Sequence, residues 1–234
     1  MVPDPTTTDE ARRGPRPRLV LMAEDRLVGD TVRVALASRG FEAIDLGWPP
    51  PHRSAEDHRR RVAPARARVG IIFGDLTSTR HRAEARAVVE AVPLRWLLVV
   101  KDPTDPVWGG MVEAGAAGVL PDSVGLDDVS LALTMLLAGE ELLSPARRRR
   151  MVQDWSESRR TDAHLAALVA RLTAREQEIL ALLYQGVTVA EIAQRTGVTE
   201  QTVRSQVKAV LRKLEVNSQL AAVAVYRRVL GGPR

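Results

Sequence analysis

Two different spacings of apolar and polar residues divide the chain into two parts. Between Arg18 and Ala138, short apolar runs alternate with segments whose apolar residues recur at helical spacing. The runs predict strands at 19–22, 42–46, 69–73, 96–100 and 118–120, and the segments between and after them predict helices at 26–38, 54–62, 80–92, 106–114 and 126–138. Strands that alternate with helices in this way predict an α/β doubly wound five-stranded parallel sheet.

Beyond residue 143 the apolar residues have helical spacing throughout, and capping signals divide this segment into separate helices. Thr173 with Glu176 and Thr188 with Glu191 each form the capping-box pattern that opens a helix. Gly186 and Gly197 are typical terminators of the two helices that follow. Thr199 caps a third helix, expected to run to Leu214, and Ser218 caps a fourth. The C-terminal segment therefore predicts an all-α domain of four short helices.

The third of these helices has one apolar and one polar side. The expected buried stripe is Val203, Val207, Val210, Leu211 and Leu214, and the opposite side carries Gln201, Arg204, Ser205, Lys208 and Arg212. Two helices joined by a tight glycine turn, with cations along the second, are typical of a helix-turn-helix that places its second helix in a DNA groove. Arg204, Ser205 and Lys208 are candidates for reading bases, and Gln201 can join them. Thr199, Thr202 and Lys213 are candidates for contacts to phosphate.

At these residues the segment resembles the C-terminal domain of the NarL/LuxR family of bacterial transcription regulators. Its opening L-T-x-R-E is present at 172–176, E-I-A at 191–193, T-V-R at 202–204 and K-L at 213–214. The resemblance implies that Arg204, Ser205 and Lys208 face the major groove and that the last helix carries a dimer contact. Gln206 departs from the family's frequent His.

The preceding unit resembles the receiver domain that this family joins to its helix-turn-helix, and so implies a flavodoxin-like sheet. The matching residues are Glu24 and Asp25 after the first strand and Asp75 after the third. In that resemblance Asp75 is the candidate phosphoacceptor, and Glu24, Asp25 and Asp75 could hold Mg²⁺. No other cofactor or metal is expected.

Departures from the receiver pattern lie at the same edge of the sheet, at the carboxyl ends of the strands, which we call the rim. Lys101 stands where the family has Thr or Ser, and Asp122 where it has the Lys that neutralises the phosphoryl group. Phosphoryl transfer needs such a cation to offset the developing charge. We therefore expect an atypical receiver that does not use conventional phosphorylation. One hypothesis is that Lys101 pairs with Asp75, and the alternative is that both are solvated.

Charge supports the same division. The 234-residue chain carries a formal net charge of +5, and residues 143–234 contain 16 Lys and Arg against 8 Asp and Glu, whereas residues 1–142 contain 18 against 21. A cationic C-terminal part favours polyanion binding there. Cysteine is absent, which excludes disulfides and thiolate sites. No apolar run is long enough for a membrane span.

The expected organisation is a disordered leader at 1–17, the receiver-like domain at 18–143, a linker helix or helices at 144–171 and the helix-turn-helix domain at 172–230. Residues 147–150 are four consecutive arginines. They form either a solvated side of the linker or an extra contact to DNA phosphate. The apolar spacing of 164–171 predicts packing on the first helix of the last domain.

We therefore expect a cytoplasmic, dimeric, non-enzymatic transcription regulator that binds double-stranded DNA, with RNA polymerase or a histidine kinase as further candidate partners. Three alternatives stay open. The chain could be a regulator switched by phosphorylation of Asp75, a sensor of a small molecule at the rim formed by Glu24, Asp75 and Lys101, or a module that binds a sigma factor or polymerase instead of DNA.

Overall fold

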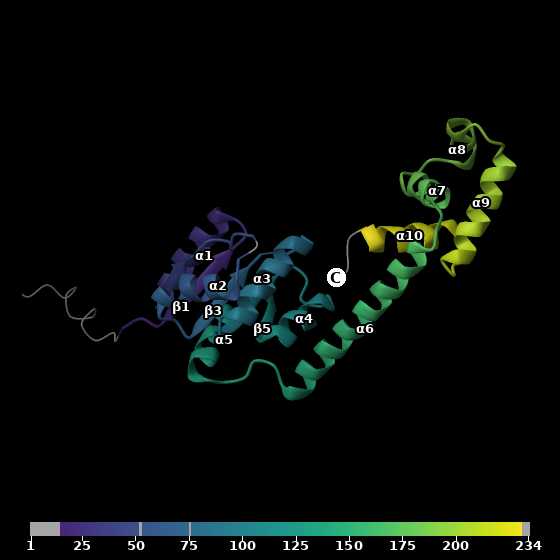
Figure 1. Ribbon diagram of the computed structural model, residues 1–234. Helices are drawn as coiled ribbons and strands as arrows, with labels where there is room; N and C mark the ends of the chain where they lie inside the picture. Colours follow the sequence, from purple (N-terminus) through teal and green to yellow (C-terminus); the bar gives the residue numbers. More distant parts are fainter. Residues whose placement is uncertain (1–14, 52, 75, 231–234) are drawn as a thin grey trace, which may run out of the picture. The chain divides into compact units, whose positions relative to one another are not determined.

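The computed structural model describes residues 15–51, 53–74 and 76–230. The chain forms two compact units, one that ends at Trp155 and one that begins at Ser156 (Figure 1). Most of the expected leader at 1–17 lies outside the described residues, and so does Asp75.

A five-stranded parallel sheet forms the centre of the first unit. Its strands are β1 (Arg18–Ala23), β2 (Glu42–Asp45), β3 (Val69–Phe73), β4 (Arg95–Val100) and β5 (Ala116–Pro121), in the order β2-β1-β3-β4-β5. All four pairings are parallel, which confirms the predicted sheet. β5 begins two residues before the expected start. Ala and Gly are poor strand formers, and pairing with β4 overrides that preference.

Five helices cover the sheet: α1 (Arg26–Ser38), α2 (Ala55–Val62), α3 (Thr79–Ala91), α4 (Val107–Ala114) and α5 (Leu126–Ala138). Because side chains alternate across a strand, each strand feeds two cores. Leu19 and Leu21 of β1 pack in the core shared with α1 and α5, while Val20 and Met22 pack in the core shared with α2, α3 and α4. This two-sided burial explains the almost continuous apolar runs of β1, β3 and β4.

Gly70 is required by close packing within this sheet. It pairs with Trp96 of β4, and a Cβ at position 70 would lie 2.3 Å from the Trp96 ring. Trp96 is fully buried and donates its indole N–H to the carbonyl of Val92 at 3.0 Å.

One helix, α6 (Pro145–Ala170), occupies the expected linker. Its first half belongs to the first unit, where Trp155 is 7% exposed and packs with Met151 in the core beside α4. The close approach depends on two glycines of α4, because a Cβ at Gly109 would lie 2.0 Å from the Met151 carbonyl oxygen and one at Gly110 would lie 2.8 Å from the Trp155 ring. The sequence did not predict this packing.

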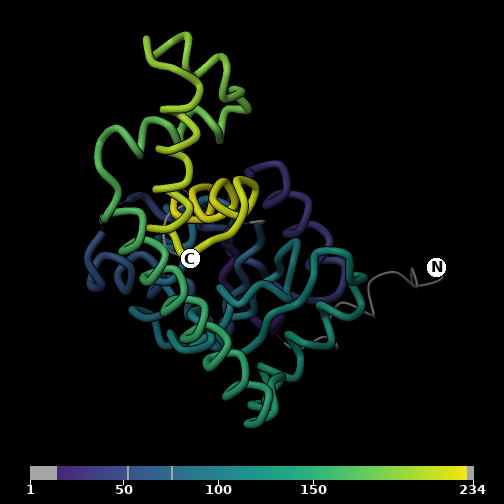
Figure 2. Tube along the Cα trace, turned by 90° about the vertical axis from the view of Figure 1, so that its right-hand side faces the viewer, coloured from purple at the N-terminus to yellow at the C-terminus, as the bar shows by residue number. Residues whose placement is uncertain are grey.

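The second half of α6 joins the core of the second unit, together with α7 (Ala174–Tyr184), α8 (Val189–Thr196), α9 (Glu200–Lys213) and α10 (Gln219–Leu230). The trace in Figure 2 runs from the end of α6 through these four helices, green to yellow. Leu168 is 4% exposed and packs with Leu180 of α7, which confirms the packing predicted for 164–171. Among the described residues, no helix is both long and apolar enough to cross a membrane.

Candidate nucleic-acid interface and the rim of the sheet

The turn between α8 and α9 is built by the residues that the sequence indicated. Thr188 accepts a hydrogen bond from the Glu191 amide at the start of α8, and the Glu191 carboxylate accepts one from the Thr188 amide at 2.8 Å. Gly197 ends α8 with φ +67°, a left-handed conformation that glycine adopts without strain. Thr199 then caps α9. The two helices therefore form a helix-turn-helix.

Apolar residues fix α9 against α8 and α7. Val203 is fully buried, Val207 is 4% exposed, and both pack with Ile192 of α8. Val210 and Leu214 bury their side chains in the other core of this unit, against α7 and α10. Leu211 is only partly buried and touches both cores. This confirms the predicted apolar stripe.

The opposite face of α9 is solvent-exposed. Its exposed side chains are Gln201, Thr202, Arg204, Ser205, Lys208 and Arg212. Exposure leaves their donors and acceptors free to meet a polyanion, as base and phosphate contacts require.

Arg204 forms an ion pair that our sequence analysis missed, although the four-residue spacing of Glu200 and Arg204 favours one on a helix. Its guanidinium lies 2.7 Å from the Glu200 carboxylate one turn earlier, and the two side chains are 58% and 47% exposed. An exposed pair of this kind is worth well under about 1 kcal/mol and is screened by salt. Arg204 can therefore exchange Glu200 for a base or a phosphate at small cost.

The hydroxyl groups of two threonines lie close together at the start of α9. The Thr199 hydroxyl accepts a hydrogen bond from the Thr202 amide at 3.2 Å, and the two hydroxyl groups lie 2.9 Å apart. The amides of a helix N-terminus together with such hydroxyls favour a phosphate. Ser205 donates its hydroxyl to the carbonyl of Gln201 at 3.0 Å, and its oxygen still has a lone pair for a partner.

Lys213 has an internal partner. Its amino group lies 2.6 Å from the carboxylate of Glu176, which is 8% exposed and also closes the capping box of α7 with Thr173. Burial acts to raise the pKa of Glu176, but hydrogen bonds from Lys213 and Thr173 outweigh it and hold the pKa below its ordinary value. The capping box was predictable, but the partner 37 residues away gave no signal in the sequence.

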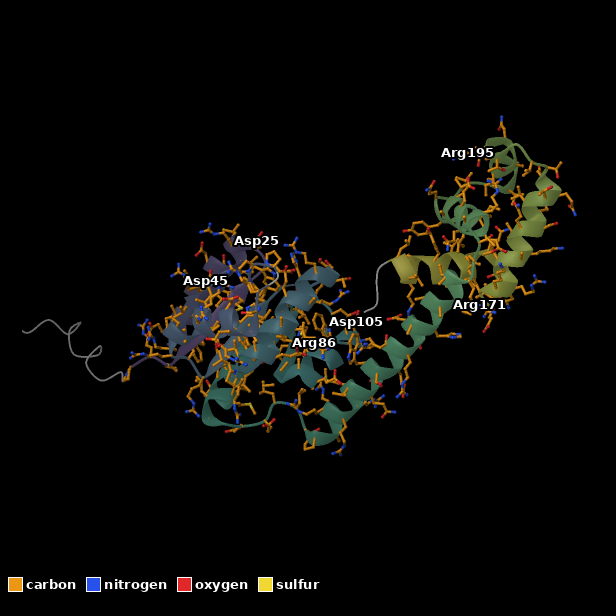
Figure 3. All side chains as sticks on the ribbon, viewed as in Figure 1. Asp25, Asp45, Arg86, Asp105, Arg171 and Arg195 are labelled. Atoms are coloured by element: carbon orange, nitrogen blue, oxygen red, sulfur yellow. The ribbon has the colours of Figure 1, made fainter. Side chains whose placement is uncertain are left out.

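At the rim of the first unit, the two acidic residues after β1 have different partners. Asp25 lies at the start of α1 (Figure 3). It caps the helix by accepting hydrogen bonds from the amides of Leu27 and Val28 at 2.7 and 3.2 Å. Glu24, with its side chain 16% exposed, instead accepts from the Leu76 amide at 3.2 Å. The sequence left open which of the pair faces the site, and the structure turns Glu24 toward the end of β3.

His81 of α3 is a rim residue that the sequence reasoning missed. Its ring Nδ1 contacts the Glu24 carboxylate, and its ring centre lies 5.4 Å from that of Trp48. The histidines show no recognisable spacing, and Glu24 and His81 meet only because α3 begins at the rim after β3. The carboxylate that could hold Mg²⁺ thus already has two protein partners.

The backbone beside Asp75 is unusual. Leu76 is 1% exposed and has φ +50°, a left-handed conformation that a branched residue rarely adopts. Its carbonyl accepts a hydrogen bond from Arg82 at 3.0 Å, while its amide donates to Glu24. These two bonds hold the chain in a conformation that costs about 1–3 kcal/mol by itself.

The remaining rim candidates, Lys101 and Asp122, are exposed. In the part of the chain that the structure describes, no group of three His, Asp or Glu side chains is arranged to hold a metal ion. Since Asp75 lies outside that part, the possible Mg²⁺ site and the Lys101–Asp75 pair stay predictions.

The chain combines an α/β unit with a parallel sheet and a unit that contains a helix-turn-helix. Residues 170–226 match the family model of bacterial regulatory proteins, luxR family. The nitrate/nitrite response regulator protein NarL of Escherichia coli K12 is 35% identical over 117 residues, which make up 50% of this chain and 53% of that protein. The chain is therefore similar, over about half of its length, to a response regulator, and its residues 170–226 match the luxR family.

Two further comparisons cover more of the chain at lower identity. The probable transcriptional regulatory protein SgaR of Hyphomicrobium methylovorum is 27% identical over 201 residues, 85% of this chain and 76% of that protein. A solved structure of the Salmonella typhimurium RcsB response regulator is 16% identical, covers 90% of this chain and 99% of its own, and superposes with a TM-score of 0.44. The chain spans about half the length of the NarL protein that it matches.

Proposed function

We propose that this chain is a cytoplasmic transcription regulator that binds duplex DNA in a sequence-specific manner through α9. The observation that carries the proposal is the exposed polar face of α9 on a helix-turn-helix whose other face is fixed by buried valines. Arg204, Ser205 and Lys208, with Gln201 beside them, would read base edges, and Thr199 and Thr202 would bind phosphate. Because Lys213 holds Glu176, we assign it to the support of α9 rather than to phosphate.

We further propose that the regulator acts as a dimer. Leu220 and Leu230 are 80% and 57% exposed, so α10 carries two large apolar side chains that a second copy would cover. A twofold dimer places its two recognition helices in half-sites about one helical turn apart.

Base readout by Arg204 is tested by measuring affinities for duplexes that differ at single positions. In Arg204→Ala the preference at one position of each half-site should relax by about 1–3 kcal/mol, because the bidentate pairing of arginine with guanine is removed. Thr202→Val is the matched comparison, since it removes only a hydroxyl that binds phosphate and should weaken all duplexes equally. Equal weakening by Arg204→Ala would assign Arg204 to phosphate.

Regulation is proposed to work without conventional phosphorylation of Asp75. This is supported by the departures at Lys101 and Asp122 and by Glu24, whose carboxylate is held by His81 and the Leu76 amide. A carboxylate that already has such partners must give them up to bind Mg²⁺.

Regulation without phosphorylation is tested by intact-mass analysis of the wild type and of Asp75→Asn after incubation with Mg²⁺ and acetyl phosphate. The folded wild-type protein should show no phosphate adduct. An adduct that disappears in Asp75→Asn would establish the alternative, a regulator switched by phosphorylation.

A further inference from the structure

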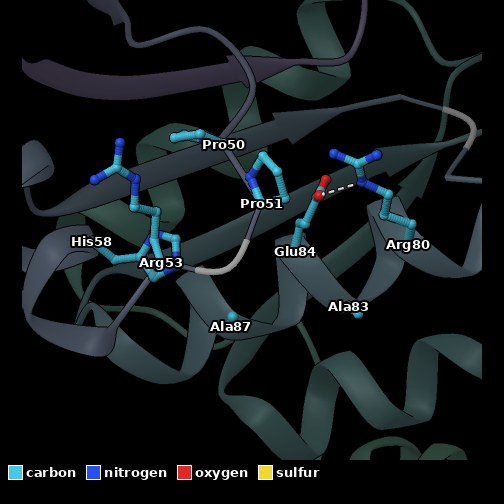
Figure 4. Close-up of a pocket in the computed structure, with 8 residues that line it drawn as sticks. All are labelled: Pro50, Pro51, Arg53, His58, Arg80, Ala83, Glu84 and Ala87. Atoms are coloured by element: carbon cyan, nitrogen blue, oxygen red, sulfur yellow. Dashed lines mark hydrogen bonds and ion pairs between the residues drawn. The ribbon is translucent and has the colours of Figure 1, made fainter.

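A groove on the first unit is lined by none of the residues assigned above to DNA binding or to the rim. It has a volume of about 580 Å³ and runs between the loop after β2 and the outer face of α3 (Figure 4). Pro50 and Pro51 lie over one side, and Ala83 and Ala87 of α3 form the other. Its lining is completed by Arg53, His58, Arg80 and Glu84.

Polar anchors hold the loop that forms one wall. One Arg61 amino group contacts the carbonyl of Leu46 and donates to those of Gly47 at 2.9 Å and Trp48 at 3.2 Å. The Trp48 indole donates to the Glu84 carboxylate on α3 at 2.8 Å. The start of the loop is therefore tied to Arg61 of α2 and to α3, next to the residues that line the groove.

The shape of the groove depends on small and rigid residues. Ala83 and Ala87 lie one turn apart on the same face of α3, and their methyl groups leave the space between helix and loop open. Opposite them the proline rings present a flat apolar surface with little conformational freedom. The apolar part of the lining thus consists of the two prolines on one side and the two alanines on the other.

The charges along the groove favour an anion. Arg80 pairs with Glu84 at 2.8 Å, so these two charges offset each other. Arg53 is exposed and forms no ion pair among the described residues, but it lies near the Asp57 carboxylate, on which its charge acts. It can therefore provide a cation for a ligand.

His58 adds a buried polar group to the lining. It is 4% exposed, and within the described residues its ring has no hydrogen-bond partner. Burial lowers the pKa of His58, and the nearby Arg61 acts in the same direction, so the ring is neutral at neutral pH. A neutral imidazole that lines the groove can donate to or accept from a ligand.

We propose that this groove binds a small aromatic carboxylate, with the aromatic ring between the prolines and the two alanines and the carboxylate on Arg53.

The same groove is linked to the rim. Glu84 holds the Trp48 indole, whose ring lies against His81, and His81 contacts Glu24. A ligand beside Glu84 therefore acts on the side chains that hold Glu24, which makes the groove an effector site that needs no phosphate.

The test uses 2-naphthoate as the probe and the ¹⁵N-labelled full chain. A ligand of this size should bind with a dissociation constant on the order of 0.01–1 mM. Saturable chemical-shift changes should centre on the amides of Arg53, Ala83 and Ala87 and extend to His81. The neutral isostere 2-naphthamide should bind about tenfold more weakly, because it lacks the charge that Arg53 attracts.

Two variants locate the site. Ala87→Leu fills the groove and should abolish the shifts, while Ala37→Leu on the exposed face of α1 should leave them unchanged. Arg53→Gln should weaken naphthoate about tenfold and leave naphthamide unaffected, and the exposed Arg60→Gln on α2 is its control. Binding that survives Ala87→Leu, or equal affinity for acid and amide, would overturn the proposal.

Discussion

At the scale of single residues, the ion pair between Lys213 and Glu176 adds to the apolar packing that holds α9. The ammonium group lies 2.6 Å from the carboxylate, with 30% of the Lys213 side chain and 11% of the Glu176 side chain exposed. A charge pair this close to the interior is screened less than a surface pair, and removing one partner leaves the other poorly solvated. The interaction therefore supports the orientation of α9 from the side away from its exposed face.

Lys213→Met should lower the free energy of unfolding of the second unit by about 1–2 kcal/mol at pH 7, because Glu176 keeps its charge and is left without its strongest partner. The pKa of Glu176 is lowered in the folded state, so its stabilising contribution is present above the ordinary pKa and is lost as the pH falls through the folded value. Urea unfolding at pH 7 and at pH 3 measures this.

The difference in the free energy of unfolding between the wild type and Lys213→Met should be smaller at pH 3 than at pH 7. Arg175→Gln is the control, since it removes an exposed pair with Glu178 on the same helix α7 and should change stability by less than about 0.5 kcal/mol. A Lys213→Met protein as stable as the wild type at pH 7 would mean that the tie contributes nothing.

At the scale of elements, α4 and α6 are joined by a close approach of their backbones. Gly109 and Gly110 lie against Met151 and Trp155, and a guanidinium nitrogen of Arg148 donates to the Val112 carbonyl at 3.2 Å. Of the four consecutive arginines, Arg148 is therefore part of this packing. Only glycine allows a second helix to come so close, since any side chain at 109 would enter the backbone of α6.

Gly109→Ala should displace the first half of α6 from α4 and destabilise the first unit by about 1–3 kcal/mol, as overpacking does in a close-packed interior. The readouts are the fluorescence of the tryptophans and trypsin cleavage at Arg147–Arg150, which should become faster. Gly125→Ala is the comparison for cleavage, because a Cβ there meets nothing closer than 3.7 Å; it alters only the N-cap of α5 and should leave cleavage in α6 unchanged. Unchanged cleavage and stability in Gly109→Ala would show that α6 does not need this close approach.

The same elements show what sequence patterns could and could not predict. The bounds of α1, β3 and α5 follow from apolar spacing and glycine stops, and the predicted bounds equal the observed ones. The division of α6 between two cores could not be predicted, because the residues that receive Trp155 are glycines 45 and more positions earlier, which have no side chain to give an apolar signal. The ties of Lys213 to Glu176 and of Glu24 to His81 were missed because tertiary packing alone brings those residues together.

At the scale of the whole molecule, the net positive charge lies in residues 143–234, where Lys and Arg outnumber Asp and Glu by 16 to 8. Arg147, Arg149 and Arg150 are exposed there. If they are solvated, replacing all three by Gln should leave the slope of log affinity against log salt unchanged. If they bind DNA, the slope should become less negative by about 0.9 for each phosphate that the variant no longer neutralises. We expect the unchanged slope, and titrations at several salt concentrations measure it.

Sequence-specific reading of DNA through α9 is the central claim for this chain. The most direct measurement is selection of the purified protein against a library of random duplexes, followed by sequencing, with an Arg204→Ala, Lys208→Ala double variant in parallel. We predict enrichment of an inverted repeat whose half-sites lie about 10 base pairs apart, and no such enrichment with the folded double variant. A folded wild-type protein that enriches no sequence would contradict the claim and would favour a module that binds a sigma factor or polymerase.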